Sequence, residues 1–347
     1  MRQIDFRVDV LKGGVRAGSL RFDAASPPSV TCDAGSEIHT SMSGSFAASE
    51  LVDYLKDELQ PVIIIDGVEH PAGVYRPGTV TETTEDARTT IQVEAYDRSI
   101  LLEWRKLEER AYYAEGTTYS SIINHYLTDA GLVLVAMTPT AATLPAAREW
   151  EIGTSYLQII NELLDELAYD HVWFDARGAA VLRPYQAPTV AAIAHTYGRS
   201  GAAEYRQIGT SRSRETDVYD KPNVFIVIRS GPEYPTPLTA TAVNDFPLSP
   251  TSITRRGLRI PQITMVDQIA SQDALQTYAN RLRDRGMEAL ETVSISTAIQ
   301  PGHGVGDVVA IEDDVLPGIY RESGWSFSLQ AGSWMTHRLE RAVLQSG

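Results

Sequence analysis

The chain has 347 residues, of which 43% are hydrophobic and 22% charged, as in an ordinary folded protein of two or three domains. Its formal net charge of −15 argues against a groove that binds nucleic acid, although it suits a wall past which DNA slides without adhering. The single cysteine, Cys32, excludes an intrachain disulfide, and we expect it to be a small buried side chain.

The first ten residues, MRQIDFRVDV, alternate apolar and polar positions. This pattern predicts a half-buried strand and does not resemble a signal peptide. The apolar runs are too short to cross a bilayer. We therefore expect a soluble protein that is made in a reducing compartment.

Residues 1–104 are expected to consist mainly of antiparallel strands. In PVIIIDGVEH (61–70), the pair Asp66-Gly67 separates two apolar runs and predicts a tight hairpin with positive φ at both positions. Residues 89–97 alternate apolar and polar side chains, which predicts another strand. The stretch 50–59 fits a short helix or a turn between strands equally well. The region is predicted to form a barrel or a sandwich.

Residues 105–190 change to a helical period. The stretch GTTYSSIINHYLTDAG (116–131) returns as GTSYLQIINELLDELA (153–168), with seven of sixteen positions identical and the starts 37 residues apart. The apolar spacing predicts one buried helix face in each copy, and Thr117 and Thr154 are the predicted N-caps. A strand is predicted after each helix, at 132–137 and 171–175, and the second continues through Ala176-Arg177-Gly178 into a strand at 179–185.

The repeat could be a duplicated site or a duplicated scaffold. Both copies keep an asparagine, Asn124 and Asn161, but His125 of the first copy is replaced by Glu162 in the second. A chemical role that survived duplication would keep its residue type, so we predict that His125 lies at the surface. The asparagines are predicted to hydrogen-bond neighbouring backbone, which makes the repeat a scaffold.

Residues 191–347 are expected to be mostly β again. Val224–Ile228 is predicted to be a buried strand, and the Pro- and Ser-rich stretch 232–252 a loop that contacts a neighbouring protein. Residues 273–286 predict an amphipathic helix that Ser271 caps and Gly286 ends. Further strands are predicted at 291–300, 307–313 and 324–345.

Two stretches have the composition of ligand-binding loops. PGHGVGD (301–307) contains three close glycines, but a phosphate-binding loop is followed by a helix, whereas a strand is predicted here, so we expect a turn. Glu312-Asp313-Asp314 could offer oxygen ligands to a cation. Its spacing matches no EF-hand loop, so we expect a solvated acidic turn.

The sequence contains no pattern that specifies a catalytic site. Asp170 and Asp175 could serve as paired carboxylates for glycoside hydrolysis, but Asp175 is explained by turn chemistry. The histidines follow no metal-ligand spacing, and no nucleophile motif occurs. We therefore assign no catalytic, cofactor-binding or metal-binding residue and expect no cofactor. The histidines are His39, His70, His125, His171, His195, His303 and His337.

Three stretches in this order resemble the hub proteins of bacteriophage tails, phage-like bacteriocins and contractile injection systems. The first is EAYDRSILLEWRKLEERAYYAEGTTYSSIINHYLTDAGL (94–132), and the second is GTSYLQIINELLDELAYDHVWFDARGAAVLRPYQAP (153–188). The third is the C-terminal run, which comprises the predicted helix at 273–286, Pro301, the GDVV stretch at 306–309 and the final strand pair at 332–343. Together they cover most of residues 90–345.

The resemblance implies an α+β, mainly β fold. Two tail-tube-like antiparallel β-barrel domains, at 1–104 and 191–347, would be joined by a smaller α+β domain at 105–190 that contains the repeat. The second barrel would carry an inserted loop and helix at about 232–290. Three copies would form a ring at the tail tip or baseplate, adapting a sixfold tube to a threefold spike or fibre and lining a channel for DNA.

The implied partners are a second and third copy of the chain, the tail tube or a distal tail protein, the tape measure protein, and a central spike or tail fibre. DNA would be in transit only, the chain would not insert into a membrane, and synthesis would occur in the host bacterial cytoplasm. The implied role is not enzymatic. The tail type stays open between contractile, long non-contractile, bacteriocin and injection machines.

The alternative is a β-rich glycan or peptidoglycan hydrolase that uses Asp or Glu, or a carbohydrate-binding tail component. Trp325 and Trp334 could bind sugar, but both lie in predicted strands, so packing in a core or an interface is expected.

Overall fold

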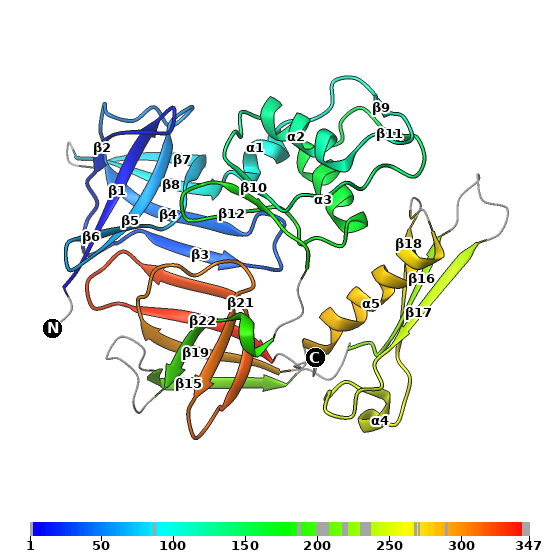
Figure 1. Ribbon diagram of the computed structural model, residues 1–347. Helices are drawn as coiled ribbons and strands as arrows, with labels where there is room; N and C mark the ends of the chain where they lie inside the picture. Colours follow the sequence, from blue (N-terminus) through cyan, green and yellow to red (C-terminus); the bar gives the residue numbers. More distant parts are fainter. Residues whose placement is uncertain are drawn as a thin grey trace.

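The computed structural model describes residues 3–85, 88–185, 189–198, 208–216, 221–229, 237–266, 269, 271–288 and 291–341. The fold is mainly β, and strands from both ends of the chain belong to one 14-stranded sheet (Figure 1). The main path of this sheet runs β15-β19-β22-β21-β3-β4-β8-β7-β5-β1-β2, with β6, β14 and β20 attached to its sides.

The N-terminal strands pair in antiparallel fashion and curl back on themselves. Phe22, beyond the end of β2, forms a bridge with Phe46 of β4, and the two rings meet edge to face at 6.5 Å. Asp66 and Gly67 have φ of 49° and 82° and join β5 to β6, which confirms the predicted hairpin. Residues 50–57 form turns and no helix. The strands are β1 (Ile4–Lys12), β2 (Val15–Leu20), β3 (Ser29–Asp33), β4 (Thr40–Ala47), β5 (Glu58–Ile65), β6 (Val68–Pro71), β7 (Tyr75–Glu85) and β8 (Arg88–Asp97).

The C-terminal strands surround a second core, which includes Tyr197, Ile295 and Leu339. Alternate positions on β19 and β22 are buried, as expected for strands with one inward face. Strands occur where 291–300, 307–313 and 324–341 predicted them, and residues 342–345 of the last prediction lie outside the described part. They are β14 (Ile193–Gly198), β15 (Ile208–Thr216), β19 (Glu291–Ala298), β20 (Val308–Glu312), β21 (Gly318–Ser328) and β22 (Trp334–Arg341).

The two β regions are joined directly to each other. β3 and β21 pair in antiparallel register, from Ser29 opposite Ser328 to Asp33 opposite Gly324. Trp325 and Phe327 of β21 also belong to the N-terminal core. Because the ladder and the core both cross this boundary, the connection does not depend on residues 105–190 alone.

Residues 99–185 form an α+β region around one core, in which Ile122, Ile160 and Leu163 are fully buried. The predicted strands occur here, but each is shorter than its apolar run. The elements are α1 (Ser99–Trp104), β9 (Ala111–Tyr113), α2 (Tyr119–Asp129), β10 (Val135–Met137), β11 (Arg148–Trp150), α3 (Tyr156–Glu166), β12 (Trp173–Phe174) and β13 (Ala180–Leu182), and the 3₁₀-helix η1 (Val190–Ala192) follows them.

A separate small unit follows β15, in which helix α5 packs on the sheet β17-β16-β18 (Figure 1). The predicted loop at 232–252 is partly wrong, because β17 occupies residues 238–243, and residues 232–236 lie outside the described part. Ser271 caps α5 as predicted, accepting a hydrogen bond from Ala274 N. The elements are β16 (Val224–Arg229), β17 (Leu238–Val243), α4 (Ile253–Arg256), β18 (Pro261–Val266) and α5 (Gln272–Glu288).

Gly286 does not end α5, contrary to the prediction. The helix continues to Glu288, and a Cβ at Gly286 would lie 2.3 Å from Cζ of Phe225. Glycine is therefore required for the close approach of the helix to β16, and not for a cap.

We expect Gly286→Ala to lower the free energy of unfolding by about 1–3 kcal/mol, because the overpacking outweighs the gain in helix propensity. Urea denaturation measures the change. In a Phe225→Leu background the same substitution should cost clearly less, since the ring is gone. An equal cost in both backgrounds would contradict this explanation.

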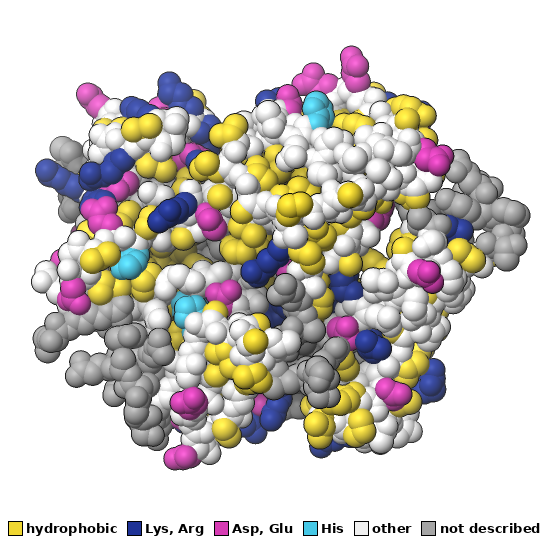
Figure 2. Space-filling view, in the orientation of Figure 1, with side chains coloured by type: hydrophobic (Ala, Val, Ile, Leu, Met, Phe, Trp, Pro, Cys, Tyr) yellow, Lys and Arg dark blue, Asp and Glu magenta, His cyan; other side chains and the backbone are white. Residues whose placement is uncertain are grey.

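On the face shown in Figure 2, acidic and basic side chains are interspersed, with hydrophobic side chains between them. Within the described residues, no helix has the length and apolar character needed to span a membrane.

Candidate functional site

The repeat is the first candidate, and its contacts recur at a spacing of 37 residues. Gly116 and Gly153 have φ of 83° and 89°, which glycine tolerates. In the first copy the Thr117 hydroxyl donates to Ala114 O at 2.7 Å, and in the second the Thr154 hydroxyl donates to Glu151 O at 2.8 Å. The shared Gly-Thr therefore builds the same turn twice.

The N-caps are Thr118 and Ser155, one residue later than predicted. Their side chains accept hydrogen bonds from Ser121 N and Gln158 N. The prediction was wrong because the threonine that both copies share, Thr117 or Thr154, donates its hydroxyl proton back to the preceding turn.

Each helix start is held by the segment that precedes the other copy. Gly116 N donates to Leu144 O at 2.9 Å, and Leu144 N donates to Thr117 O at 2.8 Å. In the second copy, Gly153 N donates to Leu107 O at 2.9 Å, and Leu107 N donates to Thr154 O at 3.0 Å. Leu107 and Leu144 are themselves 37 residues apart, so the two units exchange equivalent segments.

Strand pairing and side-chain hydrogen bonds also relate positions that are 37 residues apart. β9 pairs with β11 so that Tyr112 lies opposite Glu149, its own counterpart. The Tyr119 hydroxyl donates to Glu166 at 2.6 Å, and in the reverse direction the Tyr156 hydroxyl donates to Asp129 at 2.9 Å. The two copies thus interlock as an internal pseudo-twofold dimer, which favours scaffold over site.

Residues of the repeat that carry chemistry behave as predicted, with one exception. His125 is exposed, and Asn161 is buried and accepts from Val172 N at 3.1 Å. Asn124, however, is exposed, so the predicted backbone role holds only for the second copy.

The second candidate is a buried polar network inside the C-terminal β region. Glu322 on β21 contacts His303 Nδ1 with Oε2 at 2.6 Å and His337 Nδ1 with Oε1 at 2.5 Å. Beyond the imidazoles, His303 Nε2 meets the Tyr197 hydroxyl, and His337 Nε2 meets the Thr297 hydroxyl, both at 2.8 Å. The three central side chains are at most 1% exposed.

Both ring nitrogens of His337 have partners in this network. Nε2 contacts the Thr297 hydroxyl at 2.8 Å, and that hydroxyl can also donate to Ala298 O at 3.0 Å. On the other side of the ring, Nδ1 forms a short hydrogen bond with Glu322.

Charge and burial shift the pKa values here. Burial opposes ionisation of Glu322, but the hydrogen bonds from His303 and His337 outweigh it and lower its pKa. Burial lowers the pKa of His303, although Glu322 acts in the opposite direction. Burial opposes ionisation of Asp307, but the His195 imidazole at 3.6 Å and the hydrogen bond from Gly304 N at 2.7 Å outweigh it and lower its pKa.

These shifts predict a loss of stability in acid. Below about pH 6.5 the unfolded chain takes up a proton at His303 that the folded chain resists, and His39, whose pKa burial also lowers, adds to this effect. Glu322 and Asp307 contribute below about pH 4.5, where their unfolded carboxyls become protonated first. We therefore expect Tm to fall as pH decreases from about 6.5 to 4.

Circular dichroism melting at a series of pH values measures this. His303→Gln should flatten the upper part of the pH dependence, apart from the share that His39 contributes. A Tm that stays constant or rises on acidification would contradict the assignment.

Two donor sets here could in principle hold a metal ion: His303–Glu322–His337 and His195–His303–Asp307. In the first, the N–O separations of 2.5 and 2.6 Å are hydrogen-bond distances, whereas two ligands that share a zinc ion lie roughly 3 Å or more apart. In the second, the His195 and His303 rings stack 3.8 Å apart at 16°, so their in-plane lone pairs do not converge. Both sets fit protons better than an ion.

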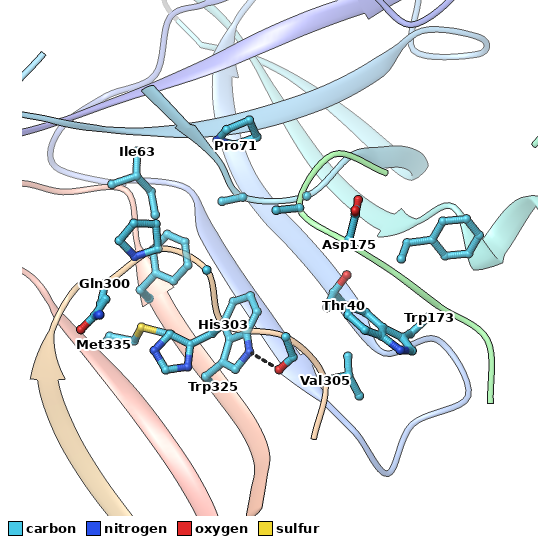
Figure 3. Close-up of a pocket in the computed structure, with 18 of the residues that line it drawn as sticks. Thr40, Ile63, Pro71, Trp173, Asp175, Gln300, His303, Val305, Trp325 and Met335 are labelled. Atoms are coloured by element: carbon cyan, nitrogen blue, oxygen red, sulfur yellow. Dashed lines mark hydrogen bonds between the residues drawn. The ribbon is translucent and has the colours of Figure 1, made fainter. Parts of the chain in front are cut away.

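A pocket lies beside this network, where the two β regions and the segment around β12 meet (Figure 3). His303, Trp325 and Met335 line it from the C-terminal side, and Trp173 and Asp175 from the α+β region. Trp325 Nε1 donates to Gly304 O at 3.4 Å. The mostly apolar lining of this pocket suits packing between the two β regions and the α+β region.

The other sequence candidates have structural explanations. The stretch 301–307 forms a turn before β20, as predicted. Asp175 accepts from Arg177 N and Ala179 N, which confirms turn chemistry. Asp313 is buried and bound to Arg212 at 2.8 Å, and Glu312 is exposed but ends strand β20, so the prediction of a solvated acidic turn holds only for Asp314.

Some of the predictions for single residues are confirmed and others are not. Cys32 is buried, as expected. Trp325 is 8% exposed and packs in the core, whereas Trp334 is 55% exposed. Core packing is therefore confirmed for Trp325 alone.

Sequence reasoning missed the network, although a signal exists. Glu322 lies two residues from Tyr320, His337 lies between Met335 and Leu339, and Thr297 follows Ile295 at the same spacing. Polar residues at inward positions of alternating strands indicate a buried polar cluster.

No family model matches the sequence, and the search of curated proteins gives no match. Solved structures do match over the whole chain. A tail protein from Neisseria meningitidis MC58 superposes with a TM-score of 0.68 at 15% identity, covering 97% of both chains. The 43 kDa tail protein of prophage MuSo2 from Shewanella oneidensis gives 0.67 at 10% identity, with 98% of this chain and 99% of that chain covered. The chain has the fold of phage tail proteins.

A third tail protein supports the same assignment. Prophage tail protein gp18 from Listeria monocytogenes EGD-e superposes with a TM-score of 0.58 at 13% identity, over 97% of this chain and 94% of that chain. The tail-protein fold thus extends over the β regions, the repeat and the small inserted unit together, which confirms the resemblance at the level of the fold.

Proposed function

We propose that the protein is a structural hub of a phage-type tail tip or baseplate. The observation that carries the proposal is the full-length match. The superpositions with this chain include at least 94% of each of three tail proteins from different bacteria. The interlocked repeat and the buried network support the proposal, because both are explained by rigidity.

In this proposal residues 1–104 and 191–347 act as two tube-like barrels and residues 105–190 as the connecting domain. Three chains form a ring that supplies six barrels to the tube above and threefold symmetry to a spike or fibre below. The tail tube or distal tail protein and the tape measure protein are the other proposed neighbours. The net charge of −15 per chain would keep DNA from adhering to the channel.

The proposal is tested by native mass spectrometry and negative-stain microscopy of the purified chain, alone and mixed with its tail-tube protein. The expected result is a threefold ring with a central hole. A monomer that stays monomeric with the tube protein present would contradict the hub. Cleavage of cell-wall glycan on a zymogram, lost in Asp170→Asn, would favour the hydrolase instead.

A further inference from the structure

A long loop joins β17 to β18 at one end of the small inserted unit (Figure 1). The two strands lie on either side of β16, so a gap of about 10 Å separates them, which three or four residues can span. The loop nevertheless takes up residues 244–260, and α4 is its one regular element. Ordered loops of this length in compact domains are usually functional. We therefore looked for what this loop presents to its surroundings.

Buried polar side chains hold the loop in one conformation. Asn244 Nδ2 donates to Ser249 Oγ and to Thr251 Oγ1, both at 2.8 Å. Asn223, just before β16, donates to Leu258 O at 3.0 Å. Neither asparagine is more than 1% exposed. Because this network fixes the backbone, the exposed side chains of the loop need little ordering when a partner binds.

The surface of the loop is apolar and basic. Leu248 and Leu258 are 74% and 52% exposed. Arg255 and Arg259 are also exposed, and within the described part of the chain their side chains form no ion pair or hydrogen bond. Residues 244–260, which we call the basic loop, contain three arginines and one acidic residue, Asp245, in a chain with a net charge of −15. Arginine beside exposed apolar side chains is typical of a protein interface, and the partner should be acidic.

An acidic surface of matching character lies on the α+β region. Residues 107–112 and 149–154 run antiparallel there, because β9 pairs with β11 and Leu107 N donates to Thr154 O. We call these two segments the acidic ribbon. Tyr112 and Ile152 of the ribbon are 61% and 67% exposed. Its exposed charged side chains are four glutamates and one arginine: Glu108, Glu109, Glu149, Glu151 and Arg110.

The charge of the acidic ribbon is only partly balanced within the chain. Arg110 pairs with Glu149 at 3.2 Å and with Glu151 at 2.8 Å, but exposed pairs of this kind are weak. The basic loop of the same chain does not reach the ribbon, since α4 and the strands β9 and β11 lie at opposite ends of the molecule (Figure 1). The two surfaces can therefore meet only between different copies of the chain.

We propose that the basic loop of one copy docks on the acidic ribbon of the next copy. Leu248 and Leu258 would pack against Tyr112 and Ile152, and the arginines would pair with the glutamates around them. The contact joins different surfaces of the two copies, so its repetition closes a ring or extends a filament. It assigns a contact to the proposed ring and rests on that proposed function for closure.

Other anionic partners match the basic loop less well. Nucleic acid would attract the arginines through its phosphates but would leave the two leucines uncovered. An anionic membrane would cover them, but two leucines bury too little apolar surface for a stable anchor. A second copy supplies both the negative charge and the apolar side chains.

The test is sedimentation equilibrium of the full chain, which gives the dissociation constant of self-association. Arg255→Glu combined with Arg259→Glu, the loop variant, should weaken association by about tenfold or more, because like charges then face each other. Added salt should weaken association of the parent chain, since exposed charges are screened. Circular dichroism melting should give the loop variant the Tm of the parent chain, because both arginines are exposed.

Arg21→Glu combined with Arg177→Glu is the matched control. Both arginines are exposed and lie outside the basic loop, and the net charge changes by the same amount as in the loop variant. The control should associate as the parent chain does. Equal weakening in the control and the loop variant would overturn the proposal, because net charge alone would then explain the effect.

A charge swap tests the pairing itself. Glu149→Arg combined with Glu151→Arg should weaken association when introduced alone. When the same two substitutions are added to the loop variant, both surfaces have reversed charge and are complementary again, so association should return to within a few-fold of the parent chain. A combined variant that associates no better than the loop variant would overturn the pairing.

The remaining outcomes separate this contact from the ring. A loop variant that forms the same ring as the parent chain, with equal affinity, would overturn the contact and leave the ring in place. A parent chain that stays monomeric at all concentrations would overturn both. Binding of a monomeric parent chain to phosphatidylglycerol vesicles, lost in the loop variant, would overturn the second copy as the partner and assign the basic loop to a membrane surface.

Discussion

Replacing Glu322 with alanine is expected to lower the free energy of unfolding by about 2–6 kcal/mol, because two buried imidazole nitrogens each lose their acceptor at a cost of about 1–3 kcal/mol. Both imidazoles that contact the carboxylate, those of His303 and His337, would keep buried nitrogen atoms with no acceptor. Urea denaturation followed by circular dichroism measures the change.

Two further variants make this result specific. Glu322→Gln should lie between the parent chain and alanine, because an amide offers one oxygen where two are used. Glu312→Ala is the control at an exposed position on β20, and we expect a change of less than about 0.5 kcal/mol. A loss below about 1 kcal/mol for Glu322→Ala would show that the network does not hold the strands.

The second large effect concerns the interlocked repeat. Ile123 on α2 and Ile160 on α3 are equivalent positions, and both are 0% exposed. We expect Ile123→Ala and Ile160→Ala each to cost about 2–5 kcal/mol, with similar values in the two copies, because each removes the same atoms from one shared core.

Ile152→Ala serves as the control, since Ile152 is 67% exposed in the same region. Equal losses in the two copies would support their structural equivalence. If one of the two buried substitutions cost several times more than the other, the pseudo-twofold description would not extend to energetics.

Local sequence patterns predicted much of the fold. The Asp66-Gly67 hairpin, the two repeat helices and the C-terminal strands follow from period, turn residues and apolar spacing, all of which depend on near neighbours. The caps were misplaced by one residue because a hydroxyl at Thr117 can point either forward to the helix or back to Ala114. Gly286 was wrongly predicted to end α5, because its close contact is with Phe225, which is distant in the sequence.

The sites were harder to predict, because their members come together only through tertiary pairing. His303, Glu322 and His337 belong to a turn and two strands, and no sequence spacing links them. The pairing of β3 with β21 could not be predicted either, because the alternating pattern of a short strand does not specify which strand it pairs with.

That last pairing has a mechanical consequence. A load applied at one end of the chain passes to the other through the β3–β21 ladder, five residue pairs long, as well as through the covalent path of residues 105–190. Sliding one β region past the other would require those hydrogen bonds to break together and Trp325 to leave the shared core. The two β regions should therefore move together as one rigid body.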